Sequence, residues 1–318
     1  ALWREGFRPE WVSPWADGSV RKILSRLGPG VIGVAAFQIN VLATYCIGFF
    51  VGGHVVASYG YAVRLLELPQ GLFAVSMATF LLPTLAGLAT EKKYGDFRTR
   101  IDEAARHLLF LNLPAAVLLF VMAEPIVQLL FQYGEFDEAA TQRTAWALRC
   151  LAPALPGYSL VLILVRAFYA LGEVRTPVKI SIACLVLNLV LALAMVFQFK
   201  DGLQQGAFGI ANTISSTLNA VLLWRALRRR EELAPIALPG LRKQLPMMMG
   251  LAWMAGLVAW GVGLGYSDGV GKNAEVSARL LTVFGPLFSA GIFYWAMSGL
   301  AGVDSAKAIL GIFRRKGS

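Results

Sequence analysis

The sequence has few charged residues, and this scarcity excludes an ordinary soluble fold. Of its 318 residues, 15% are charged and 57% are hydrophobic, and the mean hydropathy is +0.62. A typical globular chain has about 25% charged residues. Because a soluble fold of this size cannot bury so much apolar surface, we expect a large part of it to face lipid.

Histidine and cysteine are also scarce. The two histidines, His54 and His107, are too few and too far apart for a zinc site or for most histidine-based catalysis. The three cysteines, Cys46, Cys150 and Cys184, stand apart within apolar segments, which matches neither a disulfide framework nor a paired-cysteine metal site. Since no nucleophile–base pair is evident either, we predict that the protein is not an enzyme and needs no metal or cofactor for chemistry.

Long apolar segments recur along the chain, most of them about 20 residues long. A helix of this length crosses roughly 30 Å of hydrocarbon, and only helices or closed barrels satisfy the backbone there. The segments lack the alternation of a barrel strand. The sequence therefore predicts an all-α polytopic membrane protein with eight transmembrane helices, at Val31–Val51, Leu68–Ala89, Leu108–Ala123, Leu151–Leu171, Ile180–Phe199, Gly206–Trp224, Leu245–Gly265 and Leu280–Leu300.

The basic residues are concentrated in alternate loops. Of 29 Lys and Arg residues, 22 fall in the segments 1–30, 90–107, 172–179, 225–244 and 301–318. Only 4 fall in the segments 52–54, 124–148, 200–205 and 266–279. Cytoplasmic loops are enriched in Lys and Arg, so both ends of the chain are predicted to be cytoplasmic. The net charge of +10 thus reports membrane topology, and we do not expect a nucleic-acid partner.

Two charged residues lie close together near the second apolar segment. Arg64 and Glu67 share one helical face, and Pro69 and Gly71 follow directly, where they can act as a hinge. A charge within a membrane helix costs at least about 2.5–3.5 kcal/mol and normally faces a cavity. We therefore predict that Arg64 binds an anionic head group and that Glu67 orients it or offsets its charge. The alternative is a structural ion pair near the outer interface.

Uncharged polar residues occur in the middle of several predicted spans. Their oxygen atoms can coordinate Na⁺ if the helices bring them together, and the alternative is that they form hydrogen bonds between helices. Arg166 is expected to snorkel to the cytoplasmic interface, and Arg149 to anchor the outer edge of its span. The candidate cavity or ion-site residues are Gln38, Asn40, Asn188, Asn212, Thr213 and Ser216.

The outer segment 124–137 mixes apolar and acidic residues. It predicts an interfacial helix followed by a span that Asp137 caps. Glu135, Asp137 and Glu138 are the nearest approach to a catalytic acidic cluster, but acidic outer loops also complement basic inner ones.

Four motifs, in this order and separated by apolar spans, resemble the MurJ (MviN) family of lipid II flippases within the MATE-like MOP transporter superfamily. The similarity extends from about Val20 to about Ala226 and continues more loosely to the end. The motifs are Tyr61-Ala-x-Arg64-Leu-x-Glu67-x-Pro69-x-Gly71, Leu81-Leu82-Pro83-Thr84-Leu85, Leu130-Phe131-Gln132-Tyr133-Gly134-x-Phe136, and Phe168-Tyr169-Ala170 with Arg175-Thr176-Pro177-Val178-Lys179-Ile180.

The resemblance implies a fold of fourteen helices, in which two six-helix lobes surround a central cavity and two final helices extend a groove. This chain would then contain the second lobe and the last pair, and the N-terminal lobe of the same protein would be a missing partner. A chain without that lobe is expected not to transport by itself. The implied organisation is a cytoplasmic linker (1–28), the six-helix lobe (29–227), a cytoplasmic loop (228–244), two additional transmembrane helices (245–302) and a basic tail (303–318).

The resemblance also assigns residues to a binding site. Arg64 would join the arginine cluster that holds a lipid-linked pyrophosphate, and Glu67 matches an acidic position. Val63 stands where many relatives carry Asp. The implied sodium site draws on the first, fifth and sixth spans, where Asn188 matches a ligand but Ala192, one turn on, offers no oxygen.

The resulting functional prediction is the flipping of lipid II, the undecaprenyl-pyrophosphate-linked peptidoglycan precursor, across the bacterial inner membrane by alternating access. Na⁺ or the membrane potential would drive it, and membrane lipids would surround it. One alternative is another MOP carrier, exporting lipid-linked polysaccharide or drugs, although Arg64 favours an anionic substrate. A more distant alternative is a polytopic enzyme that uses lipid-linked sugar.

Overall fold

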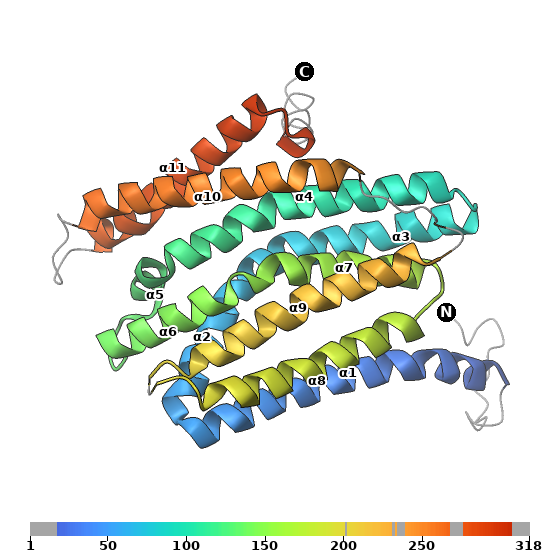
Figure 1. The fold of residues 1–318 in the computed structure, drawn as a ribbon, viewed down its shortest axis with the longest axis horizontal. Helices are drawn as coiled ribbons and strands as arrows, with labels where there is room; N and C mark the ends of the chain where they lie inside the picture. Colours follow the sequence, from blue (N-terminus) through green and yellow to red (C-terminus); the bar gives the residue numbers. More distant parts are fainter. Residues whose placement is uncertain (1–17, 201, 231–232, 234–238, 268–275, 307–318) are drawn as a thin grey trace, which may run out of the picture.

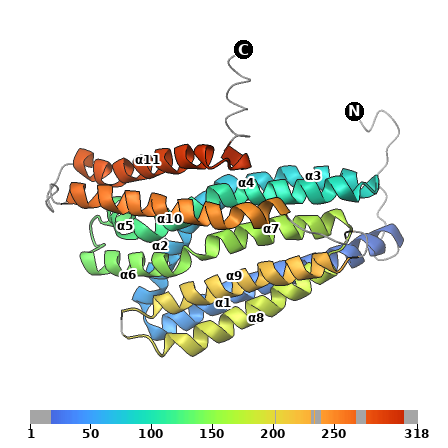
Figure 2. The same ribbon diagram turned by 45° about the horizontal axis from the view of Figure 1, so that its top comes forward.

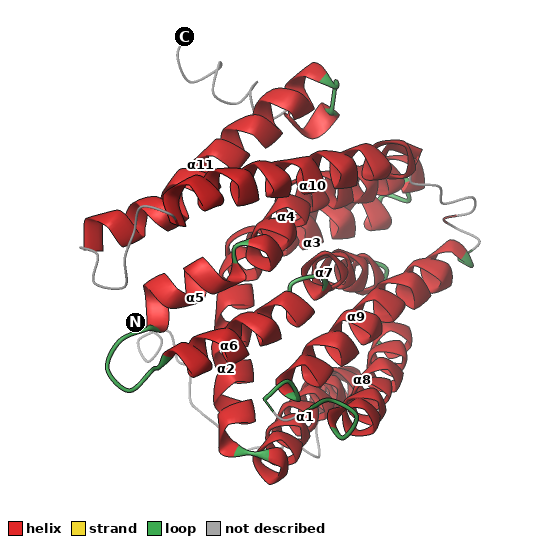
Figure 3. Ribbon diagram, turned by 60° about the vertical axis from the view of Figure 1, so that its left-hand side comes forward, coloured by secondary structure: helices red, strands yellow, loops and turns green. Residues whose placement is uncertain are grey.

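The computed structural model describes residues 18–200, 202–230, 233, 239–267 and 276–306, and within these ranges it contains helices and loops but no strand (Figures 1 and 3). The helices are α1 (Gly18–Val51), α2 (Gly53–Pro69), the π-helix η2 (Gln70–Val75), α3 (Ser76–Thr90), α4 (Tyr94–Val121), α5 (Ala123–Phe131), α6 (Glu138–Leu151), α7 (Ala154–Ala170), α8 (Arg175–Val196), α9 (Gln205–Arg228), α10 (Pro239–Ser267) and α11 (Val276–Leu300).

The helices form one layered bundle of membrane-spanning length. Seven helices are long and apolar enough to cross a bilayer, and α6 with α7 forms a bent pair that passes as an eighth span. The α10–α11 pair packs on α4 at one side of the bundle, and α1 packs beside α8 at the other (Figures 1 and 2). The predicted all-α fold with eight transmembrane helices is therefore confirmed.

The second span is longer than its apolar segment indicates. Instead of beginning at Leu68, the helix runs from Gly53 through Pro69 and the π-helical turn to Thr90. Arg64 and Glu67 lower the hydropathy of its first half. Both side chains are exposed at the surface of the chain, so the helix continues past them without burying either charge in the core.

The fourth span is two helices rather than one. α6 and α7 meet at a 46° bend near Pro153, and α6 is the part of the span that follows the expected Asp137 cap and precedes the apolar segment beginning at Leu151. Its polar residues hid it from a search for apolar segments. The expected cap is confirmed, because the Asp137 carboxylate accepts a 2.7 Å hydrogen bond from the backbone N–H of Ala140. The short helix α5 occupies the predicted interfacial segment.

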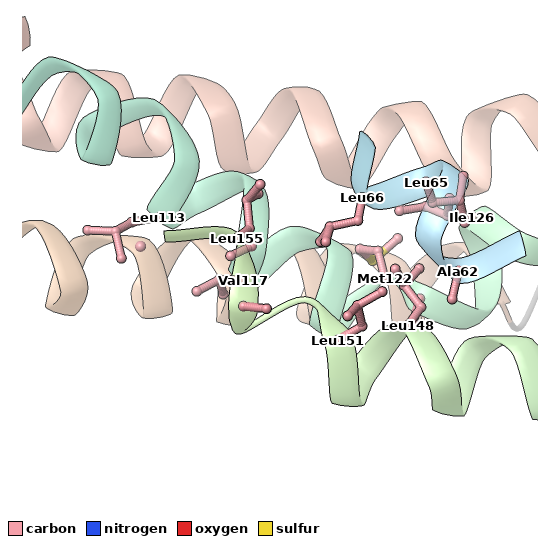
Figure 4. Packing of buried hydrophobic residues seen from close by; sticks show 14 of the residues in the cluster. Ala62, Leu65, Leu66, Leu113, Val117, Met122, Ile126, Leu148, Leu151 and Leu155 are labelled. Atoms are coloured by element: carbon pink, nitrogen blue, oxygen red, sulfur yellow. The ribbon is translucent and has the colours of Figure 1, made fainter. Parts of the chain in front are cut away.

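The core lies where α2, α4, α6 and α7 meet. Buried side chains of α2, among them Leu65 and Leu66, face Leu148 and Leu151 of α6, with Leu155 of α7 nearby (Figure 4). Small residues allow the helices to approach closely. A Cβ atom added at Gly209 of α9 would lie 2.9 Å from the backbone nitrogen of Leu151, so only glycine fits there.

The loops divide between the two ends of the bundle as predicted. The α3–α4 turn, the α7–α8 loop, the end of α9 and the start of α10 lie together at the right of Figure 1, and we call this the basic end. The α1–α2 junction, the α5–α6 loop and the α8–α9 loop lie at the other end. α1 begins at Gly18, inside the segment 1–28 predicted as a linker, and α10 begins at Pro239, inside the predicted loop 228–244. The tail beyond residue 306 lies outside the described residues.

Candidate functional site: a polar cavity between helices

A cavity of about 570 Å³ lies between α1, α2, η2, α7 and α9. Its wall is mainly apolar, but polar side chains project into it from α1, α2, η2, α7 and α9. It contains three of the six polar residues predicted from the sequence, together with Glu67 and Gly71. The polar residues that line it are Gln38, Asn40, Thr44, Tyr45, Tyr59, Glu67, Gln70, Tyr158 and Asn212.

Arg64 and Glu67 lie side by side on α2, but no ion pair joins them. Glu67 lines the cavity and Arg64 lies one turn before it, and both side chains are exposed. The structure gives no hydrogen bond or ion pair between these two described residues. The interpretation of a structural ion pair is therefore not supported, and both charged groups are available to a ligand.

An aromatic cluster holds Arg64 in place. The guanidinium carbon of Arg64 lies 5.8 Å from the centroid of the Tyr61 ring, within the range of a cation–π interaction. The Tyr61 ring packs against Phe131 at 4.7 Å and against Phe136 at 5.3 Å between centroids. Two of the sequence motifs, around Arg64 and around Gly134, are thus in direct contact, although they are far apart in the chain.

Two tyrosines and an asparagine connect three helices at the floor of the cavity. Tyr158 of α7 donates a 2.6 Å hydrogen bond to Asn212 Oδ1, and Asn212 Nδ2 donates a 2.7 Å hydrogen bond to the hydroxyl of Tyr59. The sequence analysis identified Asn212 but missed both tyrosines. The signal that could have found them is a tyrosine in the middle of a span, because its hydroxyl needs a partner when it is removed from water.

A second cluster joins α1, α8 and α9. Asn40 Nδ2 donates to Asn188 Oδ1 at 3.4 Å and to the carbonyl oxygen of Leu185 at 3.1 Å. Asn188 Nδ2 in turn donates to Ser215 Oγ at 3.2 Å. Thr213 and Ser216 stay outside this cluster. Thr213 donates to the carbonyl oxygen of Cys150, and Ser216 donates to that of Thr213. Asn40, Asn188 and Thr213 therefore form hydrogen bonds between helices, whereas the Ser216 hydrogen bond stays within α9.

The predicted hinge residues lie at a local change of helical geometry. α2 ends at Pro69, and the six residues Gln70–Val75 form a π-helix before α3 continues. Pro69 has no N–H to donate to the carbonyl one turn earlier, and the wider π turn accommodates this loss. A Cβ atom at Gly71 would meet no atom within 4 Å, so packing does not require glycine there.

The two arginines predicted at span edges differ in their surroundings. Arg149 lies 3.4 Å from the Glu124 carboxylate at the start of α5. Arg166 is partly buried, and its Nε atom has no hydrogen-bond partner among the described residues. Neither residue lines the cavity.

The fold and the cavity together define the class of the protein, an all-α multi-pass membrane protein with a polar site between its helices. The family model described as lipid II flippase MurJ matches residues 1–270, and the chain belongs to this family. The family is one of flippases of the bacterial inner membrane, which are transporters and not enzymes.

Individual relatives support the same family. A protein from Haemophilus influenzae described as "Probable lipid II flippase MurJ" is 34% identical over 70% of this chain and 44% of its own length. A "Lipid II flippase MurJ" from Burkholderia cenocepacia is 28% identical over 93% of this chain and 55% of its own length. The chain spans about half the length of the curated relatives it matches.

A solved structure has the same fold. It is described as "Lipid II flippase MurJ, inward closed conformation", and it matches with a TM-score of 0.68 and 18% identity. The match covers 87% of this chain and 54% of the other.

Proposed function

We propose that this chain is one lobe, with two additional helices, of a two-lobed carrier that flips lipid II across the inner membrane. The observation that carries the proposal is Arg64 in a member of this family, since its side chain is exposed, forms no ion pair with any described residue and lies one turn before Glu67, which lines the cavity of about 570 Å³. An arginine guanidinium has a planar set of donors that matches phosphate oxygens. The pyrophosphate of lipid II supplies those oxygens, and the N-terminal lobe would close the site.

Arg64, Glu67 and the cluster of Tyr59, Asn212 and Tyr158 each have a role in this proposal. Arg64 binds the pyrophosphate while Tyr61 keeps its guanidinium in position. Glu67 accepts hydrogen bonds from the sugar or peptide of the head group. The Tyr59–Asn212–Tyr158 cluster holds α2, α7 and α9 together while the lobe tilts. No covalent step is needed, because the reaction is a change of leaflet.

For the orientation, we propose that the basic end faces the cytoplasm. Its loops contain most of the Lys and Arg residues, and positive loops stay on the cytoplasmic side. Both ends of the chain are then cytoplasmic. Arg64 lies nearer the outer end, so the head group reaches it after entering from the cytoplasmic leaflet.

For energy coupling, we propose the membrane potential in preference to Na⁺. In the cluster at Asn188, the side-chain oxygen already accepts a hydrogen bond from Asn40, and that amide group would repel a cation. Ser215 Oγ likewise accepts a hydrogen bond from Asn188 Nδ2. Ala192, which is 1% exposed, offers only a methyl group. Outward flipping should therefore persist when Na⁺ is replaced by K⁺ at constant potential. Loss of flipping in K⁺ would instead indicate a sodium site.

The decisive experiment is to deplete the native flippase in cells that carry the full-length gene with Arg64→Ala. We expect growth to fail and lipid II to stay in the inner leaflet, because the pyrophosphate loses its partner. The matched control is Arg225→Ala, which removes an exposed arginine at the basic end, away from the cavity. Normal growth and normal lipid II delivery with Arg64→Ala would contradict the role of Arg64.

A further inference from the structure

A second concave surface lies outside the cavity, between α4, α7, α9 and the start of α10. It is a groove of about 750 Å³. Its walls are apolar, with Ile101 from α4, Ile163 from α7 and Val221 from α9. This volume is within the range of about 300–1,000 Å³ that is usual for small-ligand sites.

Three cations lie at one end of this groove. Arg228 is the last residue of α9, and Arg242 and Lys243 belong to the first turns of α10. All three side chains are exposed, and among the described residues none of them forms an ion pair. Trp224, one turn before Arg228, lines the same groove, and tryptophan is the residue that membrane proteins favour at the lipid–water interface.

The groove and the cavity lie on different faces of the helices they share, although the groove residue Ala220 is only about 80° around α9 from Asn212. On α7, the groove residues Leu160, Ile163 and Leu164 are about 140–240° around the helix from the cavity residue Tyr158. On α9, Val221 and Arg228 are about 160–180° from the cavity residue Asn212. A molecule in the groove therefore does not occupy the site of the flipped head group.

We propose that this groove binds an anionic phospholipid of the bilayer, with its acyl chain between α7 and α9 and its phosphate at Arg228, Arg242 and Lys243. The charge complementarity between an anionic head group and three cations that form no ion pair with any described residue carries the proposal, because basic pockets between transmembrane helices select such lipids. The apolar walls provide the surface for the chain. The groove joins the α10–α11 pair to the lobe through α4 and α9, so the bound lipid stabilises this junction.

The proposal can be tested with phospholipids that carry bromine on their acyl chains, because bromine quenches the fluorescence of a tryptophan that it contacts. The purified full chain in detergent is titrated with brominated phosphatidylglycerol and with phosphatidylcholine bearing the same chains. Because the chain has 8 tryptophans, the contribution of Trp224 is obtained by subtracting the quenching of the Trp224→Phe variant from that of the unchanged chain. We expect Trp224 to be quenched at an at least tenfold lower concentration of phosphatidylglycerol than of phosphatidylcholine, since each cation contributes roughly fivefold.

The cations are tested with a charge-matched pair of variants. The groove variant combines three substitutions, Arg228→Gln, Arg242→Gln and Lys243→Gln. It should lose the preference for phosphatidylglycerol. The control variant combines Arg175→Gln, Arg225→Gln and Arg229→Gln, which removes three exposed arginines outside the groove. It should keep the preference for phosphatidylglycerol. Unchanged quenching by phosphatidylcholine in the first variant shows that the groove is intact.

Three results would overturn the proposal. They are equal quenching by both lipids, an unchanged preference in the groove variant, and displacement of brominated phosphatidylglycerol by glycerol phosphate or by polyprenyl phosphate at equal concentration. The last result would mean that the site recognises phosphate alone or a carrier lipid. None of these readouts depends on flipping, so failure here is distinguishable from failure of the proposed function.

Discussion

The guanidinium carbon of Arg64 lies 5.8 Å from the centroid of the Tyr61 ring, and Tyr61 itself packs against Phe131 and Phe136. A long, exposed arginine would otherwise sample many rotamers, and ordering it on a ligand would cost conformational entropy. The aromatic cluster reduces that cost before the ligand arrives. It also connects α2 to the end of α5 and the loop that follows it.

The first prediction concerns this contact. Tyr61→Leu should weaken lipid II binding by about two- to fivefold, because a cation–π interaction of this kind contributes about 0.5–1 kcal/mol at an exposed site. Tyr61→Phe keeps the ring face and should bind almost as well as the unchanged chain. Binding of lipid II to the purified full-length protein measures both. Equal loss in the two variants would assign the effect to the hydroxyl group instead.

The second prediction separates charge from geometry at Arg64. Arg64→Lys keeps the positive charge but loses the two parallel donors that match a phosphate, so it should be partly active. Arg64→Gln should be inactive. The activities of the unchanged protein and of the two variants are ranked by how well each restores growth when the native flippase is depleted, at several expression levels. If lysine and glutamine behave alike, the geometry of the guanidinium is what matters.

The eight spans and the charged pair of α2 could be predicted from the sequence, because both are local properties. A run of apolar residues can be recognised without knowing which residues it contacts in the fold, and a charge inside such a run is easily noticed. Because the prediction used only local hydropathy, it misplaced the starts of the second and fourth spans. Arg64 and Glu67 hid the first half of the second span, and the polar residues of α6 placed the start of the fourth apolar segment at Leu151, although the Asp137 cap indicated an earlier helix start.

The partners of the polar residues could not be predicted, because they depend on how the helices pack. Asn40 and Asn188 belong to helices that meet only in the folded bundle, and the sequence left two interpretations open for them. Tyr59 and Tyr158 were missed for the same reason, since nothing in the sequence places either hydroxyl beside Asn212. Helix packing is fixed in part by glycines such as Gly209, whose importance becomes clear only in three dimensions.

The third prediction tests the cluster at the cavity floor. Asn212→Ala, Tyr158→Phe and the double variant form a double-mutant cycle, which isolates the 2.6 Å hydrogen bond between them. Hydrogen bonds between membrane helices average about 0.6 kcal/mol, so we expect a coupling of roughly 0.5–1.5 kcal/mol in the free energy of unfolding. Denaturation in detergent measures it. A coupling near zero would show that the two residues contribute independently.

The fourth prediction concerns the close approach of α6 and α9. Gly209→Leu should prevent normal packing, because even a single Cβ atom would lie 2.9 Å from the Leu151 backbone nitrogen. Overpacking of this kind costs typically about 1–3 kcal/mol, and more where backbone must move. Gly261→Leu is the control, since a Cβ atom there meets nothing within 4 Å. Yield and melting temperature in detergent should fall for the first variant and stay unchanged for the second.

The fifth prediction concerns the π-helical turn after Pro69. Pro69→Ala restores a backbone donor, and Gly71→Ala raises helix propensity by about 1 kcal/mol, without a clash at a position where nothing lies within 4 Å. Together they should favour a regular helix and stiffen the second span where it borders the cavity. We expect lipid II binding to be preserved and the rate of flipping to fall.

The control for this variant is Gly87→Ala, which raises propensity in the same continuous helix, away from the π turn, and also meets nothing within 4 Å. It should leave both binding and flipping unchanged. If the Pro69–Gly71 variant binds and flips at the normal rate, the π turn is only a consequence of proline. If both variants slow flipping equally, general helix stiffness limits the rate, and these two residues have no special role as a hinge.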